Sequence, residues 1–402
     1  MFIMGLKMWI IFTFGFAFWA RAESKTVSLN EYLKMVETQN LSIASSQASF
    51  EAADARSVGI RLPEPMVGFA QMSDTSGSSN GYEISQTIPF PAKLSNDHAA
   101  RKLEAQMEQA IASSQTNEVL AKARLLYIST WAAAEKAKLL QEKYDVIKNH
   151  LKLSQASTRS DSSLSIHALK AESDMDSVEN EILEAKQVFA EQQILFAEYA
   201  KQDPQSFRPL LESPSVSLIP SSESMAKPVQ LEAKRLNVEM FEARAAQAKS
   251  EWFPDLNLKY REFGGGTTMM ARSKEIMISA TLPFVFFWQP YAVSKSAQAE
   301  KLKSQVSYET EKLSIQSKSA ALSARAESLQ KQLELINQKL IPRAEKRMRL
   351  IRNLAPRDME SLQDHREGME VFPDLKLKAL DLRLQYETTI AELQNYVAGA
   401  KK

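Results

Sequence analysis

The sequence predicts a mainly α-helical chain with a small β part, written as two copies of one structural unit. Three observations predict it. The phrase Ile84–Phe90 recurs as Ile278–Phe284, and in both copies apolar and polar residues alternate, except at Gln86, until a proline ends the strand. A long helical pattern follows each copy, over 92–157 and 290–354. The 402 residues include only 11 glycines and 15 prolines, which suits a chain of long helices.

A second pair of markers supports the repeat. The run Ala52–Ser57 (Ala-Ala-Asp-Ala-Arg-Ser) is echoed by Ala245–Ser250 (Ala-Ala-Gln-Ala-Lys-Ser). Each run leads to a proline followed by an acid, Pro63-Glu64 and then Pro254-Asp255, which opens another strand. Two markers in the same order at nearly the same offset indicate one unit repeated along the chain.

The N-terminal residues 1–22 have the pattern of a secretory signal peptide. Lys7 supplies a positive charge, Trp9–Trp19 an apolar core, and Ala20-Arg21-Ala22 a small-x-small cleavage site. A membrane anchor is the alternative, but the apolar run is short for a span. The interpretation is therefore an exported chain.

The net charge and the absence of cysteine exclude several classes of partner and site. Removing Lys7 and Arg21 with the signal changes the formal charge from +1 to −1, which gives no electrostatic basis for nucleic acid as a partner. The chain has no cysteine, so disulfides, thiolate sites and a lipid-modified N-terminal cysteine are excluded.

The first predicted repeat covers 23–203. Its first helix has Ser28 as N-cap and Glu31 completing a capping box. A polar break at 158–165 divides the two helices of its helical hairpin. A Pro- and Ser-rich linker follows at 204–228. The predicted elements are a helix at 28–60, strands at about 66–72 and 82–90 around a turn at 73–81, and the helical hairpin 92–201.

The second predicted repeat covers 229–402 and has the same order. Its long helix contains Pro342, and a break at Ala355-Pro356 separates it from the last helix. In each repeat two shorter helices together match the long one, which predicts antiparallel coiled-coil pairing along the whole length. The predicted elements are a helix at 229–250, strands at about 256–263 and 275–284, and the helical hairpin 290–398.

The strands have the pattern of a transmembrane wall with one apolar face, because their length and alternation suit a tilted crossing of a bilayer. A soluble β-patch packed on helices is the alternative. Alternation predicts a barrel lumen lined by Glu83, Ser85, Thr87, Lys259 and Arg261. Aromatic residues at the helix-side ends of the strands predict a membrane-interface belt, with Trp252, Phe253, Phe284, Phe287 and Trp288.

Taken in order, these motifs resemble the TolC-like outer-membrane efflux protein family. The matching residues are Trp252–Leu256, Leu282–Phe284, Leu340–Ala344 and, in the first half, Ile88–Phe90. The resemblance covers essentially all of the mature chain. It implies a homotrimer in outer-membrane lipid, with a 12-stranded β-barrel that continues into a 12-helix coiled-coil periplasmic tunnel. It also implies two partners, a periplasmic adaptor (membrane fusion protein) and an inner-membrane pump.

The chain departs from the family at the tips of the helical hairpins. Family members usually carry a Tyr-x-x-Gly signature there, whereas 153–160 and 351–358 contain no glycine. Pro373 lies inside the predicted closing helix, so either that helix kinks or the second tip is a larger loop.

No catalytic or cofactor site emerges from the sequence, so no enzyme, cofactor or metal is predicted. The four histidines, His98, His150, His167 and His365, are isolated along the chain and read as solvated helix positions. Gly264-Gly265-Gly266 lacks the residues of a phosphate loop and reads as a turn. Met269 and Met270 in that turn are too few ligands to indicate a site for a soft metal.

Charged residues near the two tips are candidates for a gate. A ring of carboxylates at a constriction can select cations, and arginines can close it by pairing with acids on neighbouring hairpins. Ordinary solvated hairpin ends are the alternative. The candidates are Arg159 and Asp161 at the first tip and Arg357, Asp358, Glu360 and Asp364 at the second.

The functional hypothesis is a passive outer-membrane channel that conducts small molecules or metal ions from an inner-membrane pump. An exit duct for type I protein secretion would use the same fold. A soluble periplasmic coiled-coil adaptor or scaffold is the hypothesis from a different class. Nothing in the predicted lumen identifies a substrate.

Overall fold

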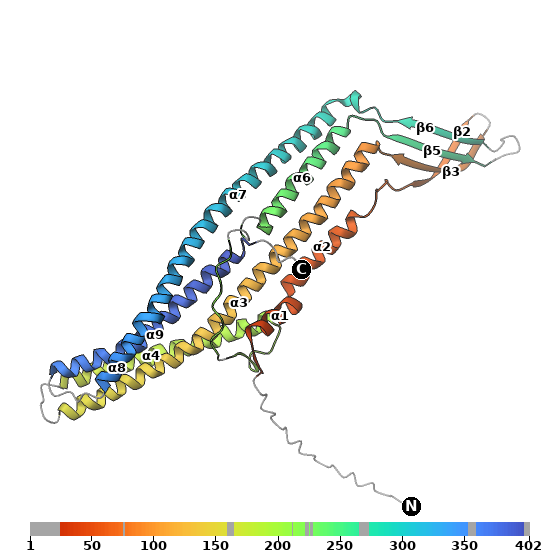
Figure 1. Cartoon of the computed structure of the whole chain (residues 1–402). Coiled ribbons are helices and arrows are strands. Elements are labelled where there is room, and N and C mark those ends of the chain that lie inside the picture. The colour runs from red at the N-terminus through yellow and green to blue at the C-terminus, as the bar shows by residue number, and fades with distance from the viewer. Residues whose placement is uncertain are drawn as a thin grey trace, which may run out of the picture.

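The computed structural model describes residues 25–74, 77–158, 165–210, 212–221, 225, 228–264, 273–352 and 359–397. The predicted signal peptide at 1–22 lies outside them. The molecule is elongated: a small sheet stands at one end, and long helices run away from it to a narrow tip (Figure 1). The predicted mainly helical fold with a small β part is confirmed.

The sheet has four antiparallel strands in the order β2-β3-β5-β6. The two repeats therefore contribute adjacent hairpins to one sheet, joined where Glu83 of β3 faces Arg261 of β5. The strands are β2 (Met66–Asp74), β3 (Gly77–Ile88), β5 (Leu256–Phe263) and β6 (Ser273–Ala280).

Two predicted strand boundaries are corrected. β3 begins at Gly77 rather than at 82, because the polar residues that suggested a turn continue the ladder, with Ser79 opposite Met72. β6 begins at Ser273 and ends at Ala280 rather than at 284. Pro283 then opens a short 3-10 helix, η2 (Pro283–Phe286), in place of more strand.

Each strand joins a helix, and the helices keep the order of the strands (Figure 1). α2 packs on α3, α3 on α6, and α6 on α7, so this half of the molecule is a single layer of helices. The helices are α2 (Leu41–Ser57), α3 (Pro91–Thr158), α6 (Val229–Ser250) and α7 (Trp288–Leu335).

The half of the molecule away from the sheet is more compact. α4 (Ser165–Tyr199) and α9 (Met359–Gln394) both pack on α3, and α9 also contacts α7 and α8 (Ile341–Arg352). The predicted pattern of one long helix flanked by two shorter ones is thus confirmed for both repeats.

The first predicted helix, 28–60, is in fact two helices. α1 (Leu29–Gln39) has the predicted capping box of Ser28 and Glu31. Asn40 then leaves helical geometry, with φ −69° and ψ 130°, and its side chain accepts a hydrogen bond from the Ser42 N–H to start α2. No proline or glycine marks this break in the sequence.

The predicted linker at 204–228 contains an unpredicted strand. β4 (Phe207–Pro209) pairs in parallel with β1 (Lys25–Val27) at mid-length of the molecule. Beside this pair lies a cluster of fully buried aromatic side chains, here called the waist cluster: Tyr32, Tyr127, Phe196 and Phe207. Phe196 stacks on Tyr32 with ring centroids 4.2 Å apart. These side chains form the largest aromatic core among the described residues.

Two prolines lie inside long helices without ending them. A π-helical turn, η3 (Ile336–Leu340), precedes Pro342 and lets the chain continue directly into α8. The wider turn accommodates the hydrogen bond that Pro342 cannot donate and the bulk of its ring. Pro373 lies within α9, which runs on from Met359 to Gln394. The predicted break at 355–356 lies outside the described residues.

Candidate functional site

One face of the sheet is largely apolar and is not covered by any other element of the described chain. The register places alternate residues of all four strands on it, so that Ile84 lies between Val67 and Tyr260 across the sheet. All but the half-buried Tyr260 are exposed, although they are large and mostly apolar. A patch of this kind normally marks contact with a partner or a membrane. The face consists of Val67, Phe69, Tyr82, Ile84, Leu256, Leu258, Tyr260, Ile276 and Ile278.

Aromatic side chains lie at both ends of this apolar face. At the end toward the loops, Tyr82 and Tyr260 donate hydrogen bonds to Glu262, at 2.5 and 2.9 Å. At the helix end, Phe90 stacks on Phe253 with ring centroids 4.4 Å apart. The five predicted belt residues, Trp252, Phe253, Phe284, Phe287 and Trp288, all lie at this helix end and are exposed. An apolar band between two aromatic rims has the layout of a bilayer-crossing wall.

The opposite face of the sheet is polar, and it brings together the charged residues predicted for the lumen. Glu83 Oε1 lies 2.8 Å from Lys259 Nζ, and Glu83 Oε2 lies 2.5 Å from Arg261 Nε. Arg261 also reaches Glu275, at 3.6 Å. These charges alternate in sign across adjacent strands, so the cluster is close to neutral.

The two remaining predicted lumen residues lie on the same polar face. Thr87 shares a 2.6 Å hydrogen bond with Asn257. Ser85 lies opposite Lys259 and Met66 and is half-buried. Two pairings on this face were not predicted from the sequence, that of Thr87 with Asn257 and that of Arg261 with Glu275.

Asp255, one of the repeated Pro-acid markers, connects three elements at the helix end of the sheet. Its carboxylate accepts from the Phe90 N–H at 2.9 Å and from Lys93 Nζ at 3.0 Å. Its own N–H donates to the Thr281 hydroxyl at 2.8 Å. Burial opposes the charge on Lys93, but the hydrogen bonds that Lys93 donates to Asp255 and Glu251 outweigh it and raise the pKa of Lys93.

The tip residues predicted for a gate are only partly described. Arg159, Asp161, Arg357 and Asp358 lie outside the described residues, and so does the side chain of Glu360. Asp364 is exposed on α9. Two residues further along the same helix, Arg366 pairs with Glu370 at 2.9 Å and with Asp174 of α4. Ion pairs therefore tie the two hairpins together close to the tip.

The structure corrects the prediction that all four histidines are isolated. His150 of α3 is buried, and its ring lies 6.3 Å from that of His365 of α9, nearly parallel to it. His150 Nε2 lies 3.3 Å from the Ser154 hydroxyl. Burial lowers the pKa of His365. The two histidines are more than 200 residues apart in sequence, so only the folded arrangement of α3 and α9 could reveal the pair.

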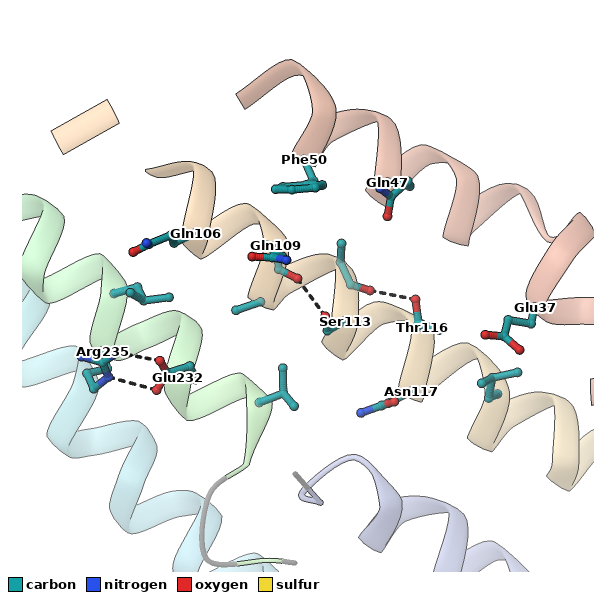
Figure 2. A pocket seen from close by; sticks show the side chains of 15 residues that line it. Glu37, Gln47, Phe50, Gln106, Gln109, Ser113, Thr116, Asn117, Glu232 and Arg235 are labelled. Atoms are coloured by element: carbon teal, nitrogen blue, oxygen red, sulfur yellow. Dashed lines mark hydrogen bonds and ion pairs between the residues drawn. The ribbon is translucent and has the colours of Figure 1, made fainter. Parts of the chain in front are cut away.

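A shallow groove of about 880 Å³ lies between α2, α3 and α6. Figure 2 shows Gln47, Gln109, Thr116 and Asn117 around it, with Arg235 held by Glu232. These amides and hydroxyls suit water and small polar solutes. They offer no nucleophile with an activating base.

Among the residues that the structure describes, His, Asp and Glu side chains nowhere gather in threes to hold a metal ion. None of the helices in the described ranges combines the length and hydropathy needed for a membrane span.

The whole chain has the fold of outer membrane channels. The Campylobacter jejuni CmeC outer membrane channel matches with a TM-score of 0.77 and 13% identity, over 100% of this chain and 95% of that one. The open state of the Neisseria gonorrhoeae MtrE outer membrane channel matches with a TM-score of 0.76 and 16% identity, over 93% and 89%. The outer membrane protein VceC of Vibrio cholerae matches with a TM-score of 0.70 and 14% identity, over 90% and 96%.

A comparison with protein families gives the same kind of match for part of the chain. Residues 221–398, the second repeat with the end of the linker, match the outer membrane efflux protein family. No curated protein sequence matches the chain. The resemblance drawn from the repeated motifs is thus confirmed: the chain is similar to outer membrane efflux proteins, a family of channels rather than of enzymes.

Proposed function

We propose that three copies of this chain form an outer-membrane exit duct for a tripartite efflux system. The two-faced sheet carries the proposal. Nine apolar or tyrosine side chains point one way, while Glu83, Lys259 and Arg261 pair on the other side. A sheet with lipid on one face and water on the other requires this division.

Four strands are too few to close around an aqueous passage. Three copies would provide twelve strands, which suffices for a pore-sized barrel, and the single layer of α2, α3, α6 and α7 would continue its wall into the periplasm. The polar faces of the sheets would then line the lumen, with Glu83, Ser85, Thr87, Lys259 and Arg261 around it.

The duct has no energy source of its own in this proposal. A pump in the inner membrane would drive transport, and a periplasmic adaptor would join it to the narrow tip. The near-neutral ion cluster in the lumen favours passage of solutes of either charge rather than strong ion selection. Small molecules or metal ions are the proposed cargo.

Fractionation of the expressed chain tests the proposal, followed by sizing of the detergent-extracted protein. A trimer in the outer-membrane fraction is the expected result. Substituting Ile84 by Lys on the apolar face should strongly reduce the yield of this trimer, since a lysine that faces lipid costs roughly 2–4 kcal/mol near the middle of the bilayer. Substituting Ser85 by Lys, on the adjacent polar face, is the matched control and should leave insertion intact. A soluble periplasmic monomer would refute the duct.

A further inference from the structure

The sheet has two open edges, at β2 and at β6, that find no partner within the described chain. Their apolar side chains are far more exposed than those of the central strands: 75% for Val67 and 69% for Ile278, against 42% for Ile84 and 39% for Leu258. Long apolar edges of this kind invite another strand. The internal repeat determines which strand fits, and in which register.

The repeat gives each residue of the first hairpin an equivalent in the second. The shared phrase equates Ile84 with Ile278. Because Val67 pairs with Ile84 and Leu258 pairs with Ile278, Val67 is equivalent to Leu258. The Pro63 and Pro254 markers, which lie upstream of the strands, give the same alignment independently. The two hairpins therefore share one register.

The contact between β3 and β5 joins the two hairpins inside one chain. It pairs Gln86 with Leu258, Ser85 with Lys259, and Ile84 with Tyr260. In the repeat, β6 is the equivalent of β3 and β2 is the equivalent of β5. The equivalent contact therefore joins β6 of one copy to β2 of the next.

From this equivalence we infer that β6 of one subunit pairs antiparallel with β2 of its neighbour in one fixed register: Ala280 opposite Val67, Ser279 opposite Gly68, and Ile278 opposite Phe69. The inference rests on the proposed trimeric duct. It adds the contact through which neighbouring subunits close the barrel, here called the seam: β6 of one subunit against β2 of the next. In this register apolar residues meet apolar ones on the outer face, and Ser279 meets Gly68 on the polar face. A slip by one residue would reverse both faces.

The helices continue the same seam. Within the chain α3 packs on α6, and the equivalent contact between copies is α7 on the neighbour's α2. α7 exposes Leu302, Val306 and Leu313, at 61%, 58% and 66%. Their spacing places them along one side of the helix, as an unpartnered packing stripe requires.

The seam gives the lumen an uneven charge pattern. At the contact inside each chain, the polar face carries Glu83 against Arg261. At the equivalent position between chains, Ala70 would face Met277. The lumen at this level would therefore alternate three ion clusters with three uncharged strips.

Disulfide crosslinking tests the register, and the chain suits it because it has no cysteine. The test uses the full chain carrying Gly68→Cys with Ser279→Cys, oxidised in membranes and run on a denaturing gel without reductant. A side chain at Gly68 meets open space, so the substitution fits. We expect covalent dimers and trimers. Val67→Cys with Ala280→Cys provides a second pair one rung away.

The matched control combines Ser279→Cys with Met72→Cys, on the same face but about 13 Å further along the strand. It should remain monomeric on the gel, because disulfides need Cα atoms within about 7 Å. Crosslinking of this control in place of the Gly68 pair would overturn the register. So would a detergent-extracted trimer in which neither predicted pair links. A monomer outside the outer membrane would instead refute the duct and the seam together.

Discussion

The waist cluster and the four-stranded sheet use the same residue types in opposite ways. At the waist, Tyr32 is fully buried and its hydroxyl donates to the Phe196 carbonyl at 3.0 Å, while Tyr127 donates to Val27. Burial raises the pKa of both tyrosines. In the sheet, Tyr82 is 44% exposed and bonds to Glu262.

The difference lies in what surrounds each region. The waist closes a core from a single chain, so its aromatic side chains are stabilised by burial and packing. The sheet directs its apolar residues outward and its ion pairs to the opposite face. In the proposed duct, lipid and the neighbouring copies would cover these surfaces. Substitutions should have different consequences in the two regions.

The largest expected effect is at the waist. Phe196→Ala removes a fully buried ring between Tyr32, Tyr127 and Phe207, and should destabilise the protein by about 3–5 kcal/mol. Phe69→Ala in the sheet is the control, because that ring is 76% exposed and leaves no cavity. Thermal unfolding of the detergent-extracted protein measures both. Equal losses would contradict the contrast between the two regions.

A smaller effect is expected within the sheet, at two glycines. A Cβ at Gly81 would lie 2.1 Å from the Glu262 carbonyl oxygen of the neighbouring strand, whereas one at Gly68 meets nothing within 4 Å. Gly81→Ala should therefore force β3 and β5 apart, at a cost of about 1–3 kcal/mol. Gly68→Ala should be nearly neutral. The yield of trimer in the outer membrane reports the difference, and an equal yield for both would show that β3 and β5 adjust freely.

The polar face should affect conduction more than stability. Glu83→Gln leaves Lys259 and Arg261 without their shared carboxylate, so the lumen becomes positive and should favour anions. Stability should change by less than about 1 kcal/mol, because partly solvated ion pairs contribute little. Reversal potentials in planar bilayers measure the selectivity. Glu262→Gln, on the outer face, is the control, and an equal shift there would remove Glu83 from the lumen.

The smallest effect concerns pH at the narrow end. Burial places the pKa of His365 below its unfolded value of about 6.5, so the unfolded state binds more protons as the pH falls through this range. Stability should be complete above about pH 6.5 and decline below it. His365→Asn should flatten this decline in thermal unfolding between pH 7.5 and 5.5. An unchanged slope would show that other groups cause it.

Much of this fold could be predicted because the sequence of the structural unit occurs twice in the chain. The repeated phrase located β3 and β6, and alternation assigned Glu83, Lys259 and Arg261 to one face. Prediction from local sequence patterns failed where pairing with a neighbouring strand determines the secondary structure. The run Ser78-Ser79-Asn80 has the composition of a turn, yet it forms strand because β2 lies beside it. Three-residue strands such as β1 and β4 have no periodicity to detect.

The site was harder to predict than the fold. Asp255 stood out as a marker, but its links to Phe90, Lys93 and Thr281 join residues from both repeats. The stacking of His150 with His365 depends on helix packing across the repeats. The gate residues Arg159, Asp161, Arg357 and Asp358 remain a proposal, as do Glu360 and Asp364.

The short parallel pair of β1 and β4 has a consequence for the order of folding. Lys25 of β1 pairs with Phe207 of β4, so β1 gains its partner only when a segment about 180 residues further along the chain is present. The segments that close the waist cluster all lie between these two strands. The first half of the chain can therefore close this core without the second half, and it offers the surface of α3 on which α6 and α9 pack.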